Sequence, residues 1–420
     1  MNLEESLQKL YSLHQFGVKL GLEKPKQLFN YLGNPQEKLQ CFHIAGSNAK
    51  GSVASFINSI LIEEGYKVGL YTSPHFVKFN ERIRINGEMI PDDYIMEFMN
   101  GLNTYIEENE PTFFELTTAI AFKYFADNHV DYSVIETGLG GRLDATNVID
   151  PVASVLTTIS LEHTNILGNS IEEIAAEKAE IIKNKSKAII GFLPESAIAI
   201  MKRKAKAVAA ELIEIKDVSV VGKDFIRLNL AHEHFNIYST PLLGTYQLKN
   251  AGLAAFTILS SIKLQKQYSV FDGISRVIQN SGIQGRYEIY NETPKVIFDS
   301  SHNSEGIENF ISEFRKEKDQ YEKCEIVFGA MKDKDIQSML KKFDNLFDKV
   351  MATSFDYERA AKIDDIKQIA DKLSIKVERL TSPEAYIEKF IEREENNCLV
   401  ILGSIYLLGH IKTKLMVEKT

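Results

Sequence analysis

The stretch CFHIAGSNAKGSVASFINSIL, residues 41–61, has the pattern of a strand, a turn of small residues and a helix. Its apolar run CFHIA is typical of a buried strand, and the residues from Val53 onward have the spacing of a buried helix. A turn from strand to helix places free backbone N–H groups and the positive end of the helix dipole where they attract an anion. The stretch therefore predicts a βα unit whose turn, GSNAKGS, is suited to phosphate.

The turn departs from the usual phosphate-loop pattern GxxxxGK[ST], because Ala49 precedes Lys50 and Gly51 follows it. Lys50 is placed to reach the β and γ phosphates of a nucleotide, and Ser52 to reach a metal ion. Ala49 adds a methyl group where the backbone approaches phosphate, at a cost of roughly 1 kcal/mol or more if the position requires a glycine conformation. On this motif alone, an ordinary βα turn is an equal alternative.

Strand-like runs and helical patterns alternate along the chain, which predicts mostly parallel α/β sheets covered by helices. The helical patterns of the first series lie at Val53–Glu64, Glu115–Asn128 and Ile171–Lys183, and a long helical stretch at 244–265 ends that series. The alternation restarts after NSGIQGRYE (280–288), whose glycines indicate a turn. We therefore place a boundary near Gly285 and predict two domains, residues 1–285 and 286–420. The strand-like runs are 41–45, 66–72, 131–137, 152–160, 187–193, 295–301, 324–330, 349–355 and 398–404.

Composition limits the class of protein. A chain of 420 residues is longer than one hydrophobic core usually serves, and its formal net charge of -9 disfavours nucleic acid as the main partner. The 3 cysteines, at positions 41, 324 and 398, lie far apart in the sequence and form no CxxC pair, which argues against a disulfide framework or a zinc ribbon. The amphipathic start is not a signal peptide and no apolar run has bilayer length, so we expect a cytoplasmic protein.

Polar side chains follow three of the predicted strands. Ser73, Glu136 and His163 stand where these strands end. Because ligands of an open α/β sheet gather at the carboxyl ends of its strands, we expect these side chains to converge beside the phosphate-binding turn. A hydroxyl, a carboxylate and an imidazole suit magnesium held against phosphates, although histidine is an uncommon magnesium ligand. Taken singly, each has a structural alternative, as a turn residue, a solvated strand end and a helix cap.

Several motifs in a fixed order carry a resemblance that extends nearly from end to end. The chain resembles the folylpolyglutamate synthase and dihydrofolate synthase family, within the Mur ligase group of ATP-dependent amide-forming enzymes. The resemblance implies an N-terminal P-loop ATPase domain with a mostly parallel sheet and a folate pocket, followed by a smaller C-terminal Rossmann-like α/β ligase domain. The motifs are HIAGSNAKGSV, TSPHFVKFNERIRING, TFFE, ETGLGGRLDATNVI, SLEHTNILG, IAAEKAEIIK, YQLKNAGLA, QGRYE, DSSHNSEGI, FGAMKDKD and ILGSIYL.

The resemblance implies a role for each matching residue, and with it Mg²⁺ as cofactor and ATP as co-substrate, bound in a cleft between the domains. Ser73, Glu136 and His163 match the magnesium ligands of the family. Lys50, Lys178 and His163 match its catalytic positions. The positions that match dihydropteroate-binding residues are Thr112, Phe114, Asp144 and Ala145. The positions that match ATP-binding residues are Gly46, Ser47, Asn48, Ala49, Lys50, Gly51, Ser52, Asn250, Arg286, Asp299 and His302.

Lys178 matches the lysine of the family motif EKAGI, which in such enzymes is carbamylated; here the motif reads EKAEI. The structural alternative is a solvated helix lysine paired with Glu177 or Glu180. Three further departures are SNAKGS for TNGKGS, LEHT for LDHT, and DSSHNS without the usual glycine and proline. Phe114 is suited to stacking on an aromatic ligand, and core packing is its alternative. Since the lysine and the proposed metal ligands are all present, we expect a working but modified site.

The implied reaction is ATP-dependent addition of L-glutamate to dihydropteroate, to folates, or to both, through an acyl phosphate. Three alternatives stay open: a Mur-type ligase acting on a UDP-sugar peptide, a non-catalytic relative that binds ATP or folate, and, weakest, a dinucleotide oxidoreductase suggested by GLGGR. We expect a monomer whose partners are small molecules, with neither nucleic acid nor membrane among them.

Overall fold

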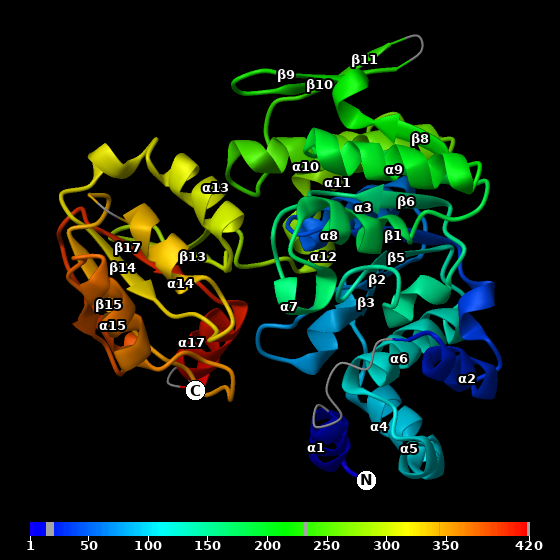
Figure 1. Cartoon of the computed structure of the whole chain (residues 1–420), viewed down its shortest axis with the longest axis horizontal. Helices are drawn as coiled ribbons and strands as arrows, with labels where there is room; N and C mark the ends of the chain where they lie inside the picture. The colour runs from blue at the N-terminus through cyan, green and yellow to red at the C-terminus, as the bar shows by residue number, and fades with distance from the viewer. Residues whose placement is uncertain (14–20, 231–232, 344, 418–420) are drawn as a thin grey trace. The chain divides into compact units, whose positions relative to one another are not determined.

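The computed structural model describes residues 1–13, 21–230, 233–343 and 345–417. The chain divides into two compact units (Figure 1). The first unit comprises residues 1–74, 79–241 and 248–283, and the second comprises 75–78, 242–247 and 284–420. The chain therefore passes between the units several times, and each unit is described here by itself.

The first unit is built on an eight-stranded sheet with the strand order β4-β3-β2-β5-β1-β6-β7-β8. The strands from β2 to β8 in this order pair in parallel, while β3 and β4 add an antiparallel edge. The strands β1 and β2 are buried throughout, as continuous apolar runs in a covered parallel sheet should be. The bounds are β1 (Cys41–Ala45), β2 (Val68–Tyr71), β3 (Ile83–Ile85), β4 (Glu88–Met89), β5 (Tyr132–Glu136), β6 (Ala153–Leu156), β7 (Lys187–Ile190) and β8 (Glu211–Glu214).

The strand order reverses at β1, which lies between β5 and β6. In an open parallel sheet, such a reversal leaves a crevice at the carboxyl ends of the strands, where ligands bind. The segments that leave these ends are residues 46–49 after β1, 137–144 after β5 and 157–163 after β6. The sheet thus brings three predicted site segments to one edge.

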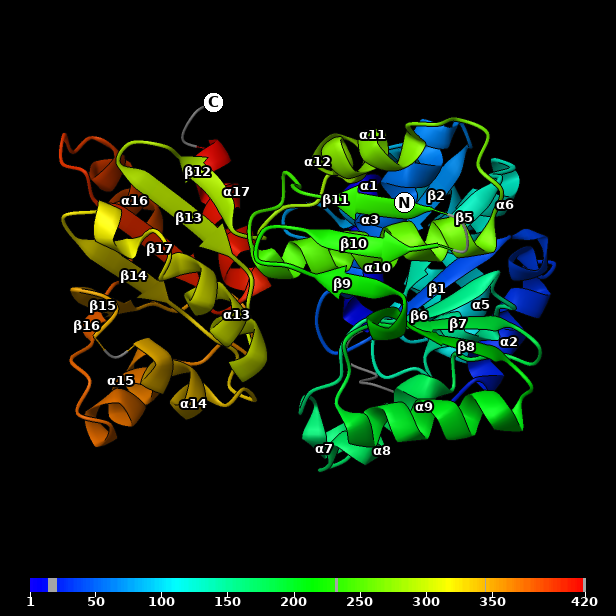
Figure 2. The same cartoon turned by 90° about the horizontal axis from the view of Figure 1, so that it is seen from above.

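Helices cover both faces of this sheet, with α9 on one side of the strands and α11 on the other (Figure 2). One apolar core joins β1, β2 and β5 to α6, and another joins β6 and β7 to α8 and α9. On the opposite face α3 is buried along most of its length. The bounds are α1 (Leu3–Ser12), α2 (Glu23–Tyr31), α3 (Lys50–Glu64), α4 (Asp92–Gly101), α5 (Asn103–Asn109), α6 (Phe113–Asp127), α7 (Thr164–Leu167), α8 (Ile171–Ala179), α9 (Glu195–Ala207), α10 (Thr245–Ser261), α11 (Ser269–Ser275) and α12 (Val277–Ser281).

Short 3-10 helices and a small antiparallel sheet complete the first unit. The 3-10 helices are η2 (Pro35–Lys38), η3 (Phe79–Arg82), η4 (Ala145–Val148) and η5 (Ile215–Asp217). The small sheet has the order β11-β10-β9 and is drawn beyond α9 and α10 in Figure 1. Its bounds are β9 (Ser219–Val221), β10 (Ile226–Asn229) and β11 (His234–Ile237).

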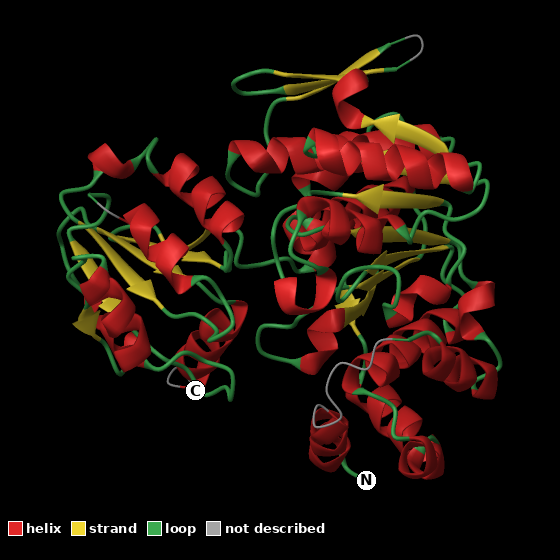
Figure 3. Cartoon of the chain, viewed as in Figure 1, coloured by secondary structure: helices red, strands yellow, loops and turns green. Residues whose placement is uncertain are grey.

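The second unit has a six-stranded sheet with the order β12-β13-β17-β14-β15-β16, parallel except for β12 at one edge. Helices pack on both faces of it (Figure 3). The bounds of the strands are β12 (Glu288–Asn291), β13 (Lys295–Asp299), β14 (Cys324–Phe328), β15 (Lys349–Ala352), β16 (Glu378–Arg379) and β17 (Cys398–Leu402). The helices are α13 (Ser304–Phe314), η6 (Lys318–Gln320), α14 (Ile336–Leu340), η7 (Lys341–Phe343), α15 (Ile363–Lys372), α16 (Pro383–Ile391) and α17 (Ile405–Val417).

The prediction of an α/β fold with mostly parallel sheets is confirmed. The cysteines show what spacing in the sequence does not reveal: Cys324 and Cys398 are register partners on the adjacent strands β14 and β17, where both are buried and free. Burial raises the pKa of the Cys324 thiol to about 11, so this thiol is not a reactive thiolate at neutral pH. Within the described residues, no helix combines the length and the apolar character that crossing a membrane requires.

Candidate active site

The phosphate loop, residues 46–52, leaves β1 and enters α3, and the segment after β6 holds its first residues. The Ser47 N–H donates to the Thr158 carbonyl at 2.8 Å, and the Asn48 N–H donates to the Thr158 hydroxyl at 2.9 Å. The Thr157 hydroxyl donates to the Asn48 carbonyl at 2.5 Å. A Cβ atom at Gly46 would lie 1.9 Å from Thr157 Oγ1, so only glycine fits there. Loop and strand end are thus locked together.

Ala49 adopts the left-handed conformation that we considered from the sequence, with φ +66° at the N-cap of α3. Lys50 is the first residue of that helix, and its ammonium folds back over the loop, donating to the carbonyls of Gly46 at 2.9 Å and Ser47 at 3.3 Å. The loop therefore combines a cation, the N-terminus of a long helix and one strained backbone position. The first two favour a bound phosphate.

Lys178 lies beneath the same loop. Its side chain is 2% exposed, and its ammonium contacts Glu162 Oε1 at 2.8 Å and donates to the Gly46 carbonyl at 3.0 Å. The alternative of a solvated helix lysine paired with Glu177 or Glu180 is wrong, because Lys178 is buried on α8 and bonds Glu162 and Gly46. Those two glutamates pair instead with Arg142 at 2.9 Å and Lys204 at 2.7 Å, respectively.

The buried Glu162–Lys178 pair is electrostatically uneven. Burial alone would raise the pKa of the Glu162 carboxyl, but the adjacent Lys178 and the nearby Lys50 lower it to about 2. Burial also lowers the pKa of Lys178, and Lys50 acts in the same direction, while Glu162 opposes both. Glu162 is therefore ionised at neutral pH. Its carboxylate is the main group that stabilises the charged form of the Lys178 amine.

The predicted metal ligands Ser73 and Glu136 lie together. The Ser73 N–H donates to Glu136 Oε2 at 3.0 Å, and Glu136 is buried at the end of β5. His163 is half-buried and is the N-cap residue of α7 with φ +46°, and its charge acts on Glu162. Among the described residues, no three or more His, Cys, Asp or Glu side chains form a metal cage.

The site nevertheless fits magnesium bound together with phosphate. That ion usually takes only one or two protein carboxylates and completes its shell with phosphate and water. Glu136 supplies such a carboxylate beside Ser73. At the same edge of the sheet, the buried hydroxyls of Thr137 and Ser160 have no hydrogen-bond partner within the part of the chain that the structure describes. These orphaned groups are suited to a polar ligand.

Thr112 and Phe114 begin α6. The Thr112 hydroxyl accepts from the Glu115 N–H at 3.3 Å, and the Glu115 carboxylate accepts from the Thr112 N–H at 2.7 Å, which makes a capping box. Phe114 is half-buried and packs on Gly138, where a Cβ atom would lie 2.3 Å from its ring. Its ring centroid lies 6.2 Å from that of Tyr71. Thr112 thus fixes the helix start that carries Phe114.

Asp144 and Ala145 lie in the glycine-rich loop, residues 138–147, which leaves β5. Both carboxylate oxygens of Asp144 are used inside this loop: they accept from the N–H groups of Leu139 at 2.8 Å and Thr146 at 3.0 Å, and from the Thr146 hydroxyl at 2.5 Å. Burial raises the pKa of the Asp144 carboxyl, and these hydrogen bonds oppose the rise. Asp144 is therefore bonded within its own loop, and Ala145 is buried beside it.

In the second unit, Arg286, Asp299 and His302 lie around the end of β13. Arg286 donates to the hydroxyl of Ser300, and Asp299 accepts from the N–H groups of Tyr287 and Ser301, each at 2.8 Å. His302 Nδ1 lies 3.0 Å from the Ser300 carbonyl oxygen. Burial raises the pKa of the Asp299 carboxyl, which the two amides and Arg286 counter. Asn250 is buried on α10, in the first unit.

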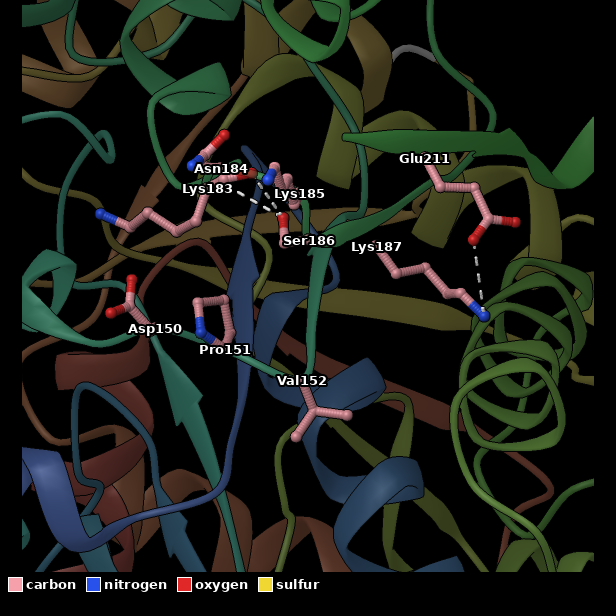
Figure 4. A pocket seen from close by; sticks show the side chains of 9 residues that line it. All are labelled: Asp150, Pro151, Val152, Lys183, Asn184, Lys185, Ser186, Lys187 and Glu211. Atoms are coloured by element: carbon pink, nitrogen blue, oxygen red, sulfur yellow. Dashed lines mark hydrogen bonds and ion pairs between the residues drawn. The ribbon is translucent and has the colours of Figure 1, made fainter. Parts of the chain in front are cut away.

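A pocket of about 550 Å³ lies elsewhere, at the amino ends of β6, β7 and β8 (Figure 4). It is polar and contains Lys183, Lys185 and Lys187, but two of these lysines are already bound: Lys183 donates to the Asn147 carbonyl at 2.9 Å, and Lys187 donates to the Ser260 carbonyl. Since the phosphate loop follows the carboxyl end of β1, this pocket is not part of the candidate site.

Sequence reasoning missed three contributors to the site. The LEHT motif presents Glu162 only as a departure from the family pattern, although its place after β6 is the same signal that predicts His163 as a site residue. Thr146 and His43 were not singled out, and their contact at 2.8 Å joins the glycine-rich loop to β1. No spacing in the sequence indicates that contact, because strand and loop lie about a hundred residues apart.

Comparison with known proteins places the chain in a family. The Mur ligase middle domain matches residues 44–258, and the Mur ligase glutamate ligase domain matches residues 285–405. A Bacillus subtilis protein named dihydrofolate synthase/folylpolyglutamate synthase is 37% identical over 96% of this chain and 96% of its own length.

Solved structures agree with this placement. Escherichia coli FolC in complex with DHPP and ADP has a TM-score of 0.89 at 27% identity, covering 100% of this chain and 99% of that chain. The Yersinia pestis bifunctional folylpolyglutamate synthase/dihydrofolate synthase complexed with AMPPNP and Mn ion has a TM-score of 0.85 at 26% identity, covering 99% of this chain and 98% of that chain. The chain therefore belongs to the dihydrofolate synthase/folylpolyglutamate synthase family of Mur ligases.

Proposed function

We propose that this chain is an ATP-dependent ligase that joins L-glutamate to dihydropteroate, to reduced folates, or to both, through an acyl phosphate. One observation carries the proposal: Lys50, the Glu162–Lys178 pair and Glu136 lie with the phosphate loop at one edge of the sheet. The Bacillus subtilis relative, named dihydrofolate synthase/folylpolyglutamate synthase, supports the same activity. We propose the same division of labour as in the sequence prediction, with residues 1–285 holding ATP and folate and 286–420 forming the ligase domain.

ATP is the phosphoryl donor in this reaction. The phosphate loop, from Gly46 to Ser52, surrounds the β and γ phosphates, and Lys50 offsets the charge that develops during transfer. Magnesium, held by Ser73, Glu136 and His163, would neutralise phosphate charge when bound. Asn250 and the group Arg286, Asp299 and His302 contact the nucleotide in this proposal. AMPPNP and Mn ion in the Yersinia pestis relative support the pairing of nucleotide and divalent ion.

The acceptor carboxylate attacks the γ-phosphorus, and ADP leaves with the bridging oxygen. The amine of L-glutamate, once neutral, attacks the acyl carbon and displaces phosphate to form the amide. Phe114 stacks on the pteridine, while Thr112, Asp144 and Ala145 shape the surrounding backbone. Positioning of this kind supplies much of the rate enhancement when reactants are brought together. Exclusion of water protects the activated acid.

Two chemical forms of Lys178 are compatible with this proposal: the free amine and the carbamylated lysine. Carbamylation, which the family resemblance implies, needs a neutral amine. Burial favours the neutral amine, and the Glu162 carboxylate opposes it. In either form Lys178 supports the loop from beneath.

The test supplies the chain with ATP, magnesium and L-glutamate, and with dihydropteroate, a reduced folate or a UDP-sugar peptide as acceptor. We expect phosphate release only when a pteroate-type acceptor and L-glutamate are both present, and a glutamylated product by mass spectrometry. Lys50→Ala should lower kcat by about a hundredfold or more, as loss of a group that stabilises transition-state charge does. Lys185→Ala, in the polar pocket at the other end of the sheet, is the matched control and should leave kcat unchanged.

Each alternative has its own outcome. A product from the UDP-sugar peptide alone would make the chain a Mur-type ligase. Binding of ATP and folate without turnover would make it a non-catalytic relative. Rapid ATP hydrolysis without acceptor or glutamate would contradict the ligase proposal. We further propose that the chain acts as a monomer on small molecules, and sedimentation at assay concentration tests this.

A further inference from the structure

A buried hydrogen-bonded relay connects β1 to the glycine-rich loop. His43, on β1, and Thr146, in η4, are each 0% exposed, and His43 Nε2 lies 2.8 Å from Thr146 Oγ1. The Thr146 hydroxyl lies 2.5 Å from Asp144 Oδ1, to which it donates. Three side chains from two separate segments thus form one line that ends at a proposed acceptor-binding residue.

The direction of each hydrogen bond follows from proton counting. A threonine hydroxyl carries one proton, and the Asp144 carboxylate only accepts. Because that proton is donated to Asp144, the hydroxyl oxygen accepts from His43, whose Nε2 must carry the imidazole proton. In a neutral imidazole, Nδ1 is then an acceptor. The relay therefore requires a proton on Nε2, which in a neutral histidine is the Nε2–H tautomer.

Asp144 passes this constraint to the backbone of the glycine-rich loop. Its second oxygen accepts from the Leu139 N–H at 2.8 Å, next to Gly138, on which Phe114 packs. The middle of the loop is fixed separately, because the Arg142 N–H donates to the Glu177 carbonyl at 2.8 Å and a Cβ atom at Gly141 would lie 2.8 Å from that oxygen. The relay thus holds the part of the loop that touches Phe114.

The imidazole of His43 has a free-energy cost at this buried position. Its Nδ1 is buried and has no hydrogen-bond partner within the described ranges of the chain. An unsatisfied buried acceptor destabilises a fold, whereas an apolar side chain in the same strand would not. Packing alone therefore does not explain an imidazole here. The feature that needs it is the Nε2 proton given to Thr146.

We propose that His43 and Thr146 are positioning residues for the acceptor site: they fix the Asp144 carboxylate, and through it the Gly138–Leu139 backbone against which Phe114 presents its ring to the pteridine. This inference rests on the proposed function, because it concerns the same acceptor. It assigns neither residue a contact with ATP, so acceptor and nucleotide binding should respond differently to their removal.

The experiment measures equilibrium binding of dihydropteroate by its fluorescence, with a non-hydrolysable ATP analogue and magnesium present. Thr146→Val removes the hydroxyl and keeps the shape, while Thr146→Ser keeps the hydroxyl. Thr257→Val is the matched control, because Thr257 is also 0% exposed but bonds only its own helix, at Leu253, at 2.7 Å. The thermal midpoint and the dissociation constant of the ATP analogue are measured for every variant.

We expect Thr146→Val to weaken dihydropteroate binding about tenfold, the loss typical of a hydrogen bond to a charged group. Thr146→Ser should bind nearly as the wild-type chain does, and Thr257→Val should bind as the wild-type chain does whatever its thermal midpoint. The ATP analogue should bind all four proteins equally. Wild-type affinity for dihydropteroate in Thr146→Val, or an equal loss for the ATP analogue, overturns the proposal.

Two histidine variants keep the test independent of Thr146. His43→Gln retains an N–H donor near the Nε2 position and should bind dihydropteroate better than His43→Leu, which has none. Nitrogen-15 NMR of the chain, which has 9 histidines, should show one neutral Nε2–H imidazole that disappears in His43→Gln. An Nδ1–H tautomer at His43 overturns the relay.

The proposed function and the relay fail in different ways. Dihydropteroate binding without turnover by the wild-type chain sinks the ligase proposal and leaves the relay to be judged by the Thr146 pair. Absence of dihydropteroate binding by the wild-type chain overturns the relay as a device of an acceptor site, even if ATP-dependent turnover with another acceptor is found.

Discussion

The phosphate loop and the glycine-rich loop follow the neighbouring parallel strands β1 and β5, yet they are held in different ways. In the phosphate loop, polar side chains of other segments bond the backbone. The hydroxyls of Thr157 and Thr158 bond the carbonyl and the N–H of Asn48, and Lys178 donates to the Gly46 carbonyl. In the glycine-rich loop, the carboxylate of its own Asp144 bonds the backbone on both sides, and the Glu177 carbonyl of α8 accepts from the Arg142 N–H in the middle of the loop.

The difference predicts how each loop fails. The phosphate loop depends on a buried charge beneath it and on one residue in a left-handed conformation, so it should respond to changes in charge and in backbone freedom. The glycine-rich loop depends on single hydrogen bonds of a buried side chain, so it should respond to removal of one polar atom. The following tests separate these two kinds of sensitivity.

The largest effect is expected from Glu162→Gln, which removes the carboxylate beneath the phosphate loop. Lys178 would be left as a buried ammonium without its partner, and breaking a buried ion pair in this way costs about 3–5 kcal/mol of unfolding free energy. Denaturant unfolding at pH 7 measures the loss. Glu180→Gln is the control, because its pair with Lys204 is partly exposed and should contribute at most about 1 kcal/mol.

Equal stability losses in the two glutamate variants would show that Lys178 is not held by Glu162 in solution. A pH series sharpens the test. Without Glu162, the pKa of Lys178 should fall further, so Glu162→Gln should regain part of its stability as the pH rises through that lowered pKa. The wild-type chain, in which Glu162 opposes the lowering of the Lys178 pKa, should show a smaller recovery.

A smaller effect concerns the glycine-rich loop and follows from the low pKa of His43. Burial, together with the charge of Lys183, lowers this pKa from 6.5 to about 3 in the folded chain. Between these values the unfolded chain binds the extra proton, so stability falls as the pH is lowered. From pH 7.5 to pH 5 this histidine alone should account for about 2 kcal/mol of lost unfolding free energy.

The measurement is unfolding free energy against pH for the wild-type chain and His43→Gln, which has no proton to gain. The variant should lose less stability over the acidic range than the wild-type chain. His129→Gln, at an exposed histidine, serves as the control for replacing a histidine by glutamine. Parallel curves for wild type and His43→Gln would mean that His43 is protonated in the folded chain at acidic pH, which contradicts the lowered pKa of its buried imidazole.

The same contrast explains which parts of the site could be predicted from the sequence. Strand β1 matches the predicted run CFHIA at both ends, and the approach of Ser73 to Glu136 follows from the rule that ligands gather at strand ends. These features are local, or they depend only on parallel strands ending at one edge. Periodicity and turn residues are enough to locate them.

Contacts across the fold could not be predicted in this way. The structural alternative for Lys178 places its partner one or two residues away, at Glu177 or Glu180, but the structure pairs it with Glu162, which follows a different element. The relay from His43 to Thr146 also joins distant segments, and so does the register that places the free thiols of Cys324 and Cys398 on adjacent strands. Each depends on which strands become neighbours, and spacing along a sequence does not contain that information.

The smallest effect is expected from Ala49→Gly, which relieves the strained position of the phosphate loop. At φ +66°, alanine is disfavoured relative to glycine by about 1 kcal/mol, and its methyl group stands where the backbone meets phosphate. Ala209 is also left-handed, at φ +51°, but is exposed at the end of α9 and far along the chain from the loop. Ala209→Gly therefore relieves a left-handed alanine in the same way, at a position that is outside the phosphate loop. Both variants should shift the thermal midpoint slightly and alike, while only Ala49→Gly should lower the KM for ATP, by a factor of several. If Ala49→Gly instead raises that KM, the phosphate loop is fitted to alanine, and the left-handed residue contributes to nucleotide binding rather than weakening it.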